Sequence, residues 1–275
     1  MNFAKVRFYI YFCSLIILKM YEKRSFLAEK SFLVQGIFLI LLFIAGLTII
    51  PTLFSALGMV LFQTLNTAEI PLWFLRISLL VNQVSAFLLP ALVFAYSVEN
   101  NWFNFSKSNF GITRKQWTVV TATLLLLLPL ISLLTQFNQN IVFPENWQPL
   151  EAWFRALEAK NNALVERLIS TPLYLSAVLN LFFIAMLPAV CEEFFFRGTL
   201  QPYLLKYFKH PLWAILIVAF IFSAFHLDFF GFIPRFVLGI YLGVLVYWTK
   251  SLWSAVWAHF LNNGIALLIQ YYEII

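Results

Sequence analysis

Long apolar runs separated by short polar segments dominate the pattern of this chain. A helix that crosses the hydrocarbon layer of a membrane needs about 20 mostly apolar residues. Seven runs meet this requirement, so we expect an all-α fold, a polytopic transmembrane helix bundle of about seven or eight spans. The runs are residues 31–54, 74–97, 116–136, 173–197 or slightly beyond, 212–227, 235–249 and 252–271.

The N-terminal segment does not fit this pattern. Residues 8–18 are apolar but short for a span, and no small-residue cleavage site follows them, so a signal peptide fits poorly. We expect residues 1–30 to be a cytoplasmic or interfacial segment, with an eighth span as the alternative. Met20 also allows residues 1–19 to be a start-site extension. The rest divides into three N-terminal transmembrane helices (31–136), an external amphipathic segment (137–172) and a transmembrane core (173–272).

Composition supports the membrane assignment. Hydrophobic residues make up 62% of the 275 residues, charged residues only 11%, and the mean hydropathy is +0.86. A soluble domain carries roughly 25% charged residues, and disordered chains are poor in apolar residues. These figures exclude a water-soluble enzyme and a disordered protein. The two cysteines, Cys13 and Cys191, have no second cysteine at metal or redox spacing.

The net charge of +6 is informative through its distribution. With seven spans and a cytoplasmic N-terminus, only Arg155, Lys160 and Arg167 lie outside the cell. This positive-inside bias predicts a cytoplasmic N-terminus and gives no reason to expect a nucleic-acid partner. The basic residues on the predicted cytoplasmic side are Lys5, Arg7, Lys19, Lys23, Arg24, Lys30, Lys107, Arg114, Lys115, Lys206, Lys209 and Lys250.

The external segment 137–172 has the pattern of an amphipathic helix. Pro149 followed by Glu151 suits a helix start. Two interpretations stay open: a helix lying on the membrane surface, and a lid over a substrate entrance. The apolar residues at helical spacing are Leu150, Phe154, Leu157, Leu164 and Leu168.

Polar and ionisable residues gather inside the spans of the second half of the chain. Each ionisable group at the bilayer centre costs about 2.5 to 3.5 kcal/mol, so such residues usually face the bundle interior and serve a function. Glu193 and Arg197 are four residues apart and share a helix face, which predicts an ion pair. Glu192 lies about 100° away around the helix and is outside that register. The full set is Glu192, Glu193, Arg197, His226, His259, Asn262 and Asn263.

These side chains suit hydrolysis. Glu192, helped by a histidine, would activate water as a general base. His259 and Asn263, which share a helix face, would donate hydrogen bonds to the oxyanion. Glu192, His226 and His259 also form a His₂Glu set of the kind found in some catalytic zinc sites, although there is no His-Glu-x-x-His helix. A solvated, interfacial Glu192 and purely structural histidines are the non-catalytic alternatives.

Three motifs in order resemble the CAAX prenyl protease and bacteriocin-processing (CPBP, Abi or type II CAAX) family of intramembrane endopeptidases. The family pattern is Glu-Glu-x-x-x-Arg, Phe-x-x-x-His and His-x-x-x-Asn on successive helices. Residues 185–268 carry it, and Gly239 and Gly243 add a spacing that favours close helix packing. The corresponding residues are Glu192, Glu193 and Arg197, then Phe222 and His226, then His259 and Asn263.

The resemblance implies an endopeptidase whose catalytic residues are Glu192, His226, His259 and Asn263, supported by Glu193 and Arg197. It implies that Glu192 and His226 activate water and that no cofactor is needed, with zinc as the alternative. It also implies a lipid bilayer and a peptide or membrane-protein substrate as partners. A compact chain without an evident organellar extension favours the bacterial inner (plasma) membrane.

A different class of function remains in competition. The chain is also compatible with a non-catalytic immunity or scaffold protein that binds a bacteriocin-like membrane peptide. A haem held by His226 and His259 would leave Glu192 unexplained, and the absence of repeated halves counts against a transporter.

Overall fold

The computed structural model describes residues 26–274 except 65, 67–68, 100–104, 109–110 and 171–173, and every regular element within these residues is helical. The all-α bundle expected from the apolar runs is therefore confirmed. The expectations for residues 1–19, and most of those for the 1–30 segment, lie outside the described residues.

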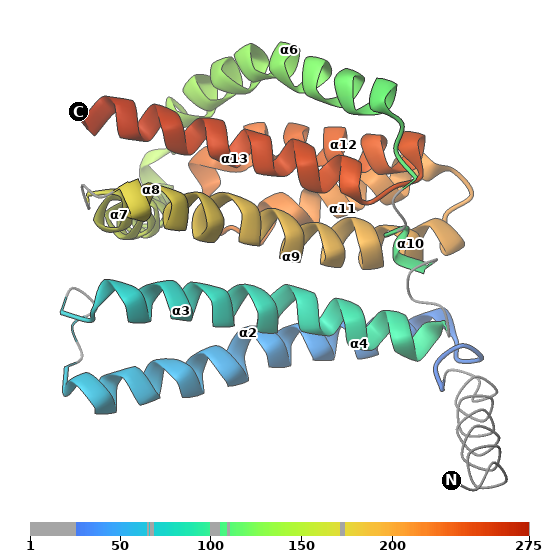
Figure 1. Ribbon diagram of the computed structural model, residues 1–275, viewed down its shortest axis with the longest axis horizontal. Coiled ribbons are helices and arrows are strands. Elements are labelled where there is room, and N and C mark those ends of the chain that lie inside the picture. Colours follow the sequence, from blue (N-terminus) through green and yellow to red (C-terminus); the bar gives the residue numbers. More distant parts are fainter. Residues whose placement is uncertain are drawn as a thin grey trace, which may run out of the picture.

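The N-terminal helices form a layer of their own (Figure 1). Helix α2 (Phe32–Phe62) lies against a second rod made of α3 (Leu72–Gln83), the π-helix η1 (Val84–Leu88) and α4 (Leu89–Val98). The two rods approach closely at Gly46, where a side chain would collide with the carbonyl group of Ser85.

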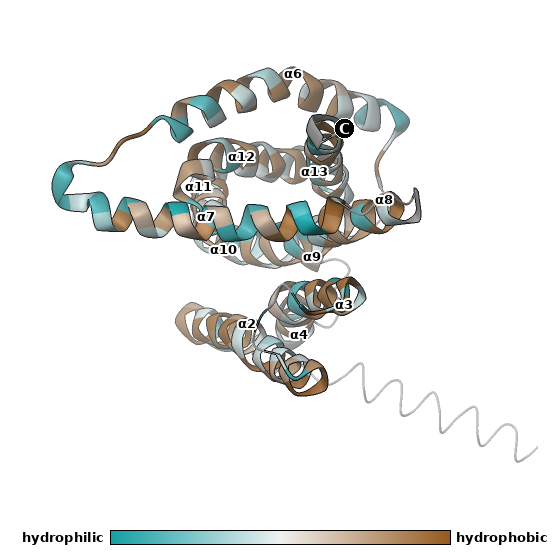
Figure 2. Ribbon diagram, turned by 90° about the vertical axis from the view of Figure 1, so that its left-hand side faces the viewer, coloured by the Kyte–Doolittle hydropathy of each residue, from teal (hydrophilic) through white to brown (hydrophobic). Residues whose placement is uncertain are grey.

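The second layer contains the remaining helices. A long rod crosses it, consisting of α8 (Tyr174–Asn180), the π-helix η3 (Leu181–Met186), α9 (Leu187–Phe195), the π-helix η4 (Phe196–Leu200) and α10 (Gln201–Tyr207). Figure 2 shows α9 and three other helices nearly end-on, arranged around a common centre, with α6 (Arg114–Gln139) on the outside. The three helices are α11 (Pro211–Ala224), α12 (Phe232–Thr249, preceded by the 3₁₀ turn η5, Phe229–Gly231) and α13 (Trp253–Ile274).

Among the described residues, five helices are long and apolar enough to cross a membrane: Phe32–Phe62, Leu72–Val98, Arg114–Gln139, Ser176–Tyr207 and Phe229–Thr249. The other two expected spans correspond to α11 and α13, which are helical but are not among these five. Helix α11 has only 14 residues, because the chain leaves it just before His226. Helix α13 has 22 residues, but His259, Asn262 and Asn263 interrupt its apolar surface. The count of seven spans stays a prediction.

Each π-helix is followed by a proline at the second residue of the next helix, at Pro90, Pro188 and Pro202. Proline has no N–H to donate, and its ring clashes with the carbonyl group four residues earlier. A π-turn inserts an extra residue and so relieves this clash. At Pro188 the chain therefore has a widened turn just before the two glutamates.

The segment between α6 and α8 folds into the 3₁₀ turn η2 (Glu145–Trp147) and helix α7 (Gln148–Ile169). Helix α7 runs across one end of the bundle instead of along it (Figure 2). Its first half is fixed by Arg155, whose Nη1 and Nη2 donate 3.0 Å hydrogen bonds to the side chain and the backbone carbonyl of Gln139. Near its last turn, the carbonyl oxygen of Leu168 accepts a hydrogen bond from Asn180.

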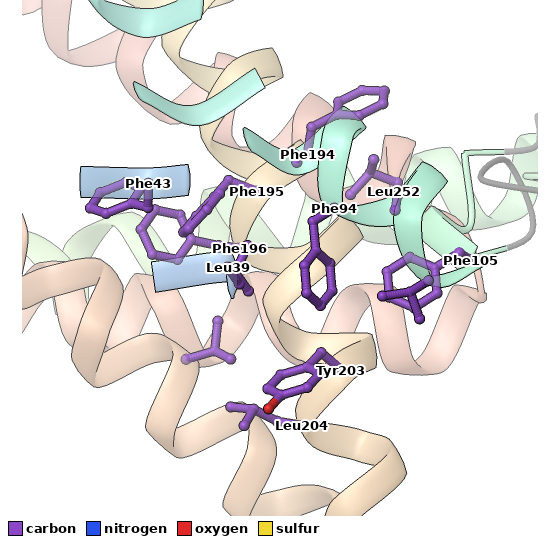
Figure 3. Packing of buried hydrophobic residues seen from close by; sticks show 14 of the residues in the cluster. Leu39, Phe43, Phe94, Phe105, Phe194, Phe195, Phe196, Tyr203, Leu204 and Leu252 are labelled. Carbon is purple, nitrogen blue, oxygen red and sulfur yellow. The ribbon is translucent and has the colours of Figure 1, made fainter. Parts of the chain in front are cut away.

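Aromatic side chains fill the interface between the two layers. Phe43 of α2 lies 4.8 Å from Phe195 of α9, and Phe87 of η1 lies 5.8 Å from Phe196, measured between ring centroids. Figure 3 shows the rings of Phe43, Phe195 and Phe196 close to one another, with side chains of α4 and α10 nearby. This packing holds the N-terminal layer against α9, the helix that carries both glutamates.

Candidate active site

Glu193 lies at the centre of a fully buried polar cluster. Its Oε1 accepts hydrogen bonds from Arg197 Nη1 at 2.8 Å and from His259 Nδ1 at 2.9 Å. Arg197 also donates from Nη2 to the Gly239 carbonyl at 2.9 Å, and its guanidinium lies 4.5 Å from the centre of the Phe222 ring. The ion pair predicted from the spacing of Glu193 and Arg197 is present. The contact with His259 is new, because nothing in local spacing links α9 to α13.

The side chain of Glu192 has different neighbours, Gln83 and His226. Its Oε1 accepts a 3.2 Å hydrogen bond from Nε2 of Gln83, on α3. Its Oε2 lies 4.0 Å from Nε2 of His226 and has no hydrogen-bond partner in the described part of the chain. The side chain is only 7% exposed. Glu192 is thus held in place through one oxygen, while the other faces a histidine across a gap.

Gln83 is the site residue that the sequence analysis missed. It lies 109 positions before Glu192, in the half of the chain without a recognisable family motif. A glutamine inside an apolar run was the signal available in the sequence. The structure adds that Gln83 lies directly before the π-helix η1, and such turns often lie at functional sites.

His226 is oriented by the end of α11. Its Nδ1 lies 2.8 Å from the carbonyl oxygen of Phe222. Because a carbonyl can only accept, Nδ1 carries the proton, and in the neutral ring Nε2 presents a lone pair toward Glu192. Leu227, with a φ of 51°, then turns the chain out of the helix. A non-glycine residue in this conformation is uncommon, and the turn leads the chain into η5.

His259 and Asn263 lie one turn apart on α13. Because a carboxylate can only accept, His259 Nδ1 carries the proton shared with Glu193, and Nε2 is the ring nitrogen left over. Asn263 receives a 3.3 Å hydrogen bond on Oδ1 from Asn262, which leaves its N–H groups free to donate elsewhere. Both side chains line the same cavity as Glu192.

This cavity has a volume of about 580 Å³ and brings the predicted catalytic residues together. Glu192, His226, His259 and Asn263 all contribute to its wall, whereas Glu193 and Arg197 lie behind it. Asp228 and Arg235 form a 2.7 Å salt bridge farther along the wall. The other polar lining residues are Gln83, Thr135, Gln139, Asn262 and Gln270.

The alternative zinc set does not assemble in this structure. Within the described residues, no three His, Cys, Asp or Glu side chains converge closely enough to hold a metal ion. Glu192, His226 and His259 therefore do not fit a zinc site as arranged here.

A family model matches part of the chain. The model described as "Type II CAAX prenyl endopeptidase Rce1-like" covers residues 174–265, from the start of α8 to the middle of α13. All six residues predicted to be catalytic or supporting lie in this region, and Gln83 lies outside it. Comparison with curated proteins finds no match, and neither does comparison with solved structures.

Proposed function

We propose that this chain hydrolyses a peptide bond within the membrane using water activated by Glu192, because residues 174–265 match the model of the Rce1-like type II CAAX prenyl endopeptidases. The match and the membrane-spanning helices support a multi-pass membrane protease that acts on a protein or peptide. To this we add a glutamate mechanism and the roles of single side chains.

The observation that carries the mechanism is the gap between Glu192 and His226. Two hydrogen bonds of about 2.8 Å from one water molecule span roughly the 4.0 Å that separates Glu192 Oε2 from His226 Nε2. Both atoms accept, so a water there donates both of its protons and points a lone pair away from them. A water oriented in this way is a good nucleophile for a carbonyl carbon.

The opposite wall of the cavity suits the oxyanion. With Nδ1 held by Glu193, a protonated His259 donates from Nε2, and the adjacent carboxylate of Glu193 stabilises the positive ring. The free N–H of Asn263 supplies a second donor. Donors fixed before the reaction stabilise charge that develops in the transition state.

These residues account for every proton transfer in the hydrolysis. The water oxygen bonds to the peptide carbonyl carbon, and its proton passes to Glu192. The carbonyl oxygen becomes an oxyanion held by His259 and Asn263. When the C–N bond breaks, Glu192 returns this proton to the leaving nitrogen. The second proton of the water stays on the new carboxyl group and then passes to the amine, so that a carboxylate and an ammonium group leave the site. No covalent intermediate and no metal ion enters these steps.

The test is cleavage of a membrane-peptide library by the purified protein in lipid. Glu192→Gln keeps the side-chain volume but is not a base, so turnover should fall about 100-fold or more. Glu166→Gln, on the exposed surface of α7, is the matched control and should retain activity. Equal turnover of Glu192→Gln and wild type would refute the assignment of the base.

Further experiments distinguish the glutamate mechanism from a zinc mechanism and from a protein that only binds peptides. A chelator should leave turnover unchanged, and loss of activity that zinc restores would establish the metal mechanism instead. Glu193→Gln should mainly lower the yield of folded protein, because it weakens the buried cluster around Arg197. A library that neither wild type nor Glu192→Gln cleaves would favour the peptide-binding immunity protein.

A further inference from the structure

The cavity is not central along the bundle. From Glu192 in the middle of α9, its wall continues through Gln139 at the last turn of α6, Asp228 after α11, Arg235 in the first turn of α12 and Gln270 near the end of α13. All four lie at the end of the bundle that α7 crosses (Figures 1 and 2). We call this the α7 end, and the opposite end, where α10 and the start of α13 lie, the lysine end.

The two ends differ strongly in charge. At the lysine end the described basic side chains outnumber the acidic ones, which are Glu29 and Glu99. At the α7 end acidic side chains balance or exceed the basic ones, which are Arg76, Arg155, Lys160, Arg167 and Arg235. The lysine end carries Lys30, Lys107, Arg114, Lys115, Lys206, Lys209 and Lys250; the acidic residues of the α7 end are Glu69, Glu145, Glu151, Glu158, Glu166 and Asp228.

Short loops rich in lysine and arginine stay in the cytoplasm. This rule places the lysine end in the cytoplasm and the α7 end on the other side of the membrane. The sequence alone gave the same polarity for the chain. The structure adds the direction in which the cavity runs from Glu192, which is toward the α7 end. The sequence does not give this direction, because it does not show which ends of α6, α12 and α13 lie together.

Helix α7 lies beside this end of the cavity and holds one of its wall residues. Gln139 is a wall residue, and α7 holds it from two positions: Arg155 donates to its Oε1 at 3.0 Å, and Glu158 accepts from its Nε2 at 2.7 Å. Arg155 also lies 3.3 Å from the centre of the Phe230 ring, in η5. A substrate that enters from the α7 end therefore passes beside this helix.

The residues that line the cavity also indicate which class of ligand it binds. Besides Gln139, whose amide is held by Arg155 and Glu158, carboxamides recur along it at Gln83, Asn262, Asn263 and Gln270. A carboxamide carries both donor and acceptor groups, the combination that pairs with the N–H and C=O groups of an extended peptide. The wall carries no cluster of like charges, since Asp228 and Arg235 pair with each other.

We infer that the cavity is entered from the non-cytoplasmic side, beside α7, and that its substrate is an extended peptide segment presented on that face. Such a segment belongs to a membrane protein or membrane-bound peptide whose cleaved region lies outside the cytoplasm. A prenylated C-terminus displayed in the cytoplasm is on the wrong side. The side of entry stands on the fold and the charges, and only the identity of the peptide as a substrate rests on the proposed function.

Cysteine labelling tests the side of entry without requiring activity. In a chain carrying Cys13→Ser and Cys191→Ala, single cysteines are placed at Gln270, on the cavity wall, and at Lys209, at the lysine end; both positions are exposed. Intact bacterial cells are treated with a membrane-impermeant maleimide. We expect Gln270→Cys to react in intact cells and Lys209→Cys only after permeabilisation. The reverse pattern would overturn the inference.

Lys160→Cys, on the exposed face of α7, is a second variant at the same end in case Gln270→Cys does not fold. A cleavage experiment then tests the substrate. Library peptides are added to sealed right-side-out vesicles and to inverted vesicles, each containing wild type or Glu192→Gln. We expect wild-type cleavage only in right-side-out vesicles. Cleavage confined to inverted vesicles refutes the side of entry, whereas no cleavage in either, with the labelling pattern intact, refutes the protease alone.

Discussion

At the scale of single residues, two neighbouring glutamates have unlike environments because successive helical positions differ by about 100°. Glu193 faces α12 and α13 and is neutralised by Arg197 within a fully buried cluster. Glu192 faces α3 and the cavity, and among the described residues its Oε2 accepts no hydrogen bond. One carboxylate is therefore structural and orients His259, and the other is available for chemistry.

Gln83 should be a positioning residue for Glu192. Gln83→Leu keeps most of the volume but removes the hydrogen bond to Oε1, so the carboxylate is free to rotate away from His226. A hydrogen bond to a charged group is worth about 1.5–3 kcal/mol, which corresponds to a loss of about 10- to 100-fold in kcat. KM should change little, and steady-state kinetics in lipid measure both.

Asn82→Leu, at the exposed neighbouring position, is the control for changes in α3 as a whole. Gln83→Glu should also be slow, because a second carboxylate would compete for the proton and shift the pH profile of kcat. Wild-type kcat in Gln83→Leu would show that the hydrogen bond plays no part in turnover.

At the scale of elements, α11 and α12 cross closely because of glycine. A Cβ on Gly239 would lie 3.1 Å from both Cα and Cβ of Ala219, and one on Gly243 would lie 2.9 Å from Ile215 Cγ2. The close helix packing expected from the Gly239 and Gly243 spacing is confirmed. The same approach brings the Gly239 carbonyl within reach of Arg197.

Gly239→Ala should push α12 away from α11. Overpacking of this kind costs about 1–3 kcal/mol in the free energy of unfolding, and it moves the carbonyl that accepts from Arg197. Chemical unfolding in detergent micelles measures the loss. Gly264→Ala in α13 is the matched control, since its Cβ would make only an ordinary 3.5 Å contact with Leu181. Equal stability of the two variants would contradict this account of the crossing.

At the scale of the whole molecule, Asn180 connects the two layers and α7. Its Oδ1 accepts from Arg76 of α3 at 3.1 Å, and its Nδ2 donates to the Leu168 carbonyl of α7 at 2.6 Å and to the Tyr271 hydroxyl of α13 at 2.7 Å. The side chain is completely buried. One amide thus joins four helices at the end of the bundle where the cavity opens.

Asn180→Leu should loosen this end of the molecule. The substitution leaves buried polar groups unsatisfied, which lowers the free energy of unfolding by about 1–3 kcal/mol for each group. Limited proteolysis should cut within α7 faster than in wild type. Asn140→Leu is the control, because Asn140 is exposed and bonds only within its own helix end. Unchanged stability and cutting in Asn180→Leu would show that α7 is held by its other contacts alone.

The sequence by itself determined the helical class, the membrane environment, the members of the candidate catalytic cluster and the Glu193–Arg197 pair. These follow from apolar run length, from the energy of placing ionisable groups in lipid and from spacing along one helix, all of which are local properties. Only the tertiary structure decided that Gln83 holds Glu192, that Glu193 also holds His259, and that the cavity continues toward α7. These contacts join residues far apart in the chain, and they depend on how whole helices pack, which the periodicity of a single helix does not specify.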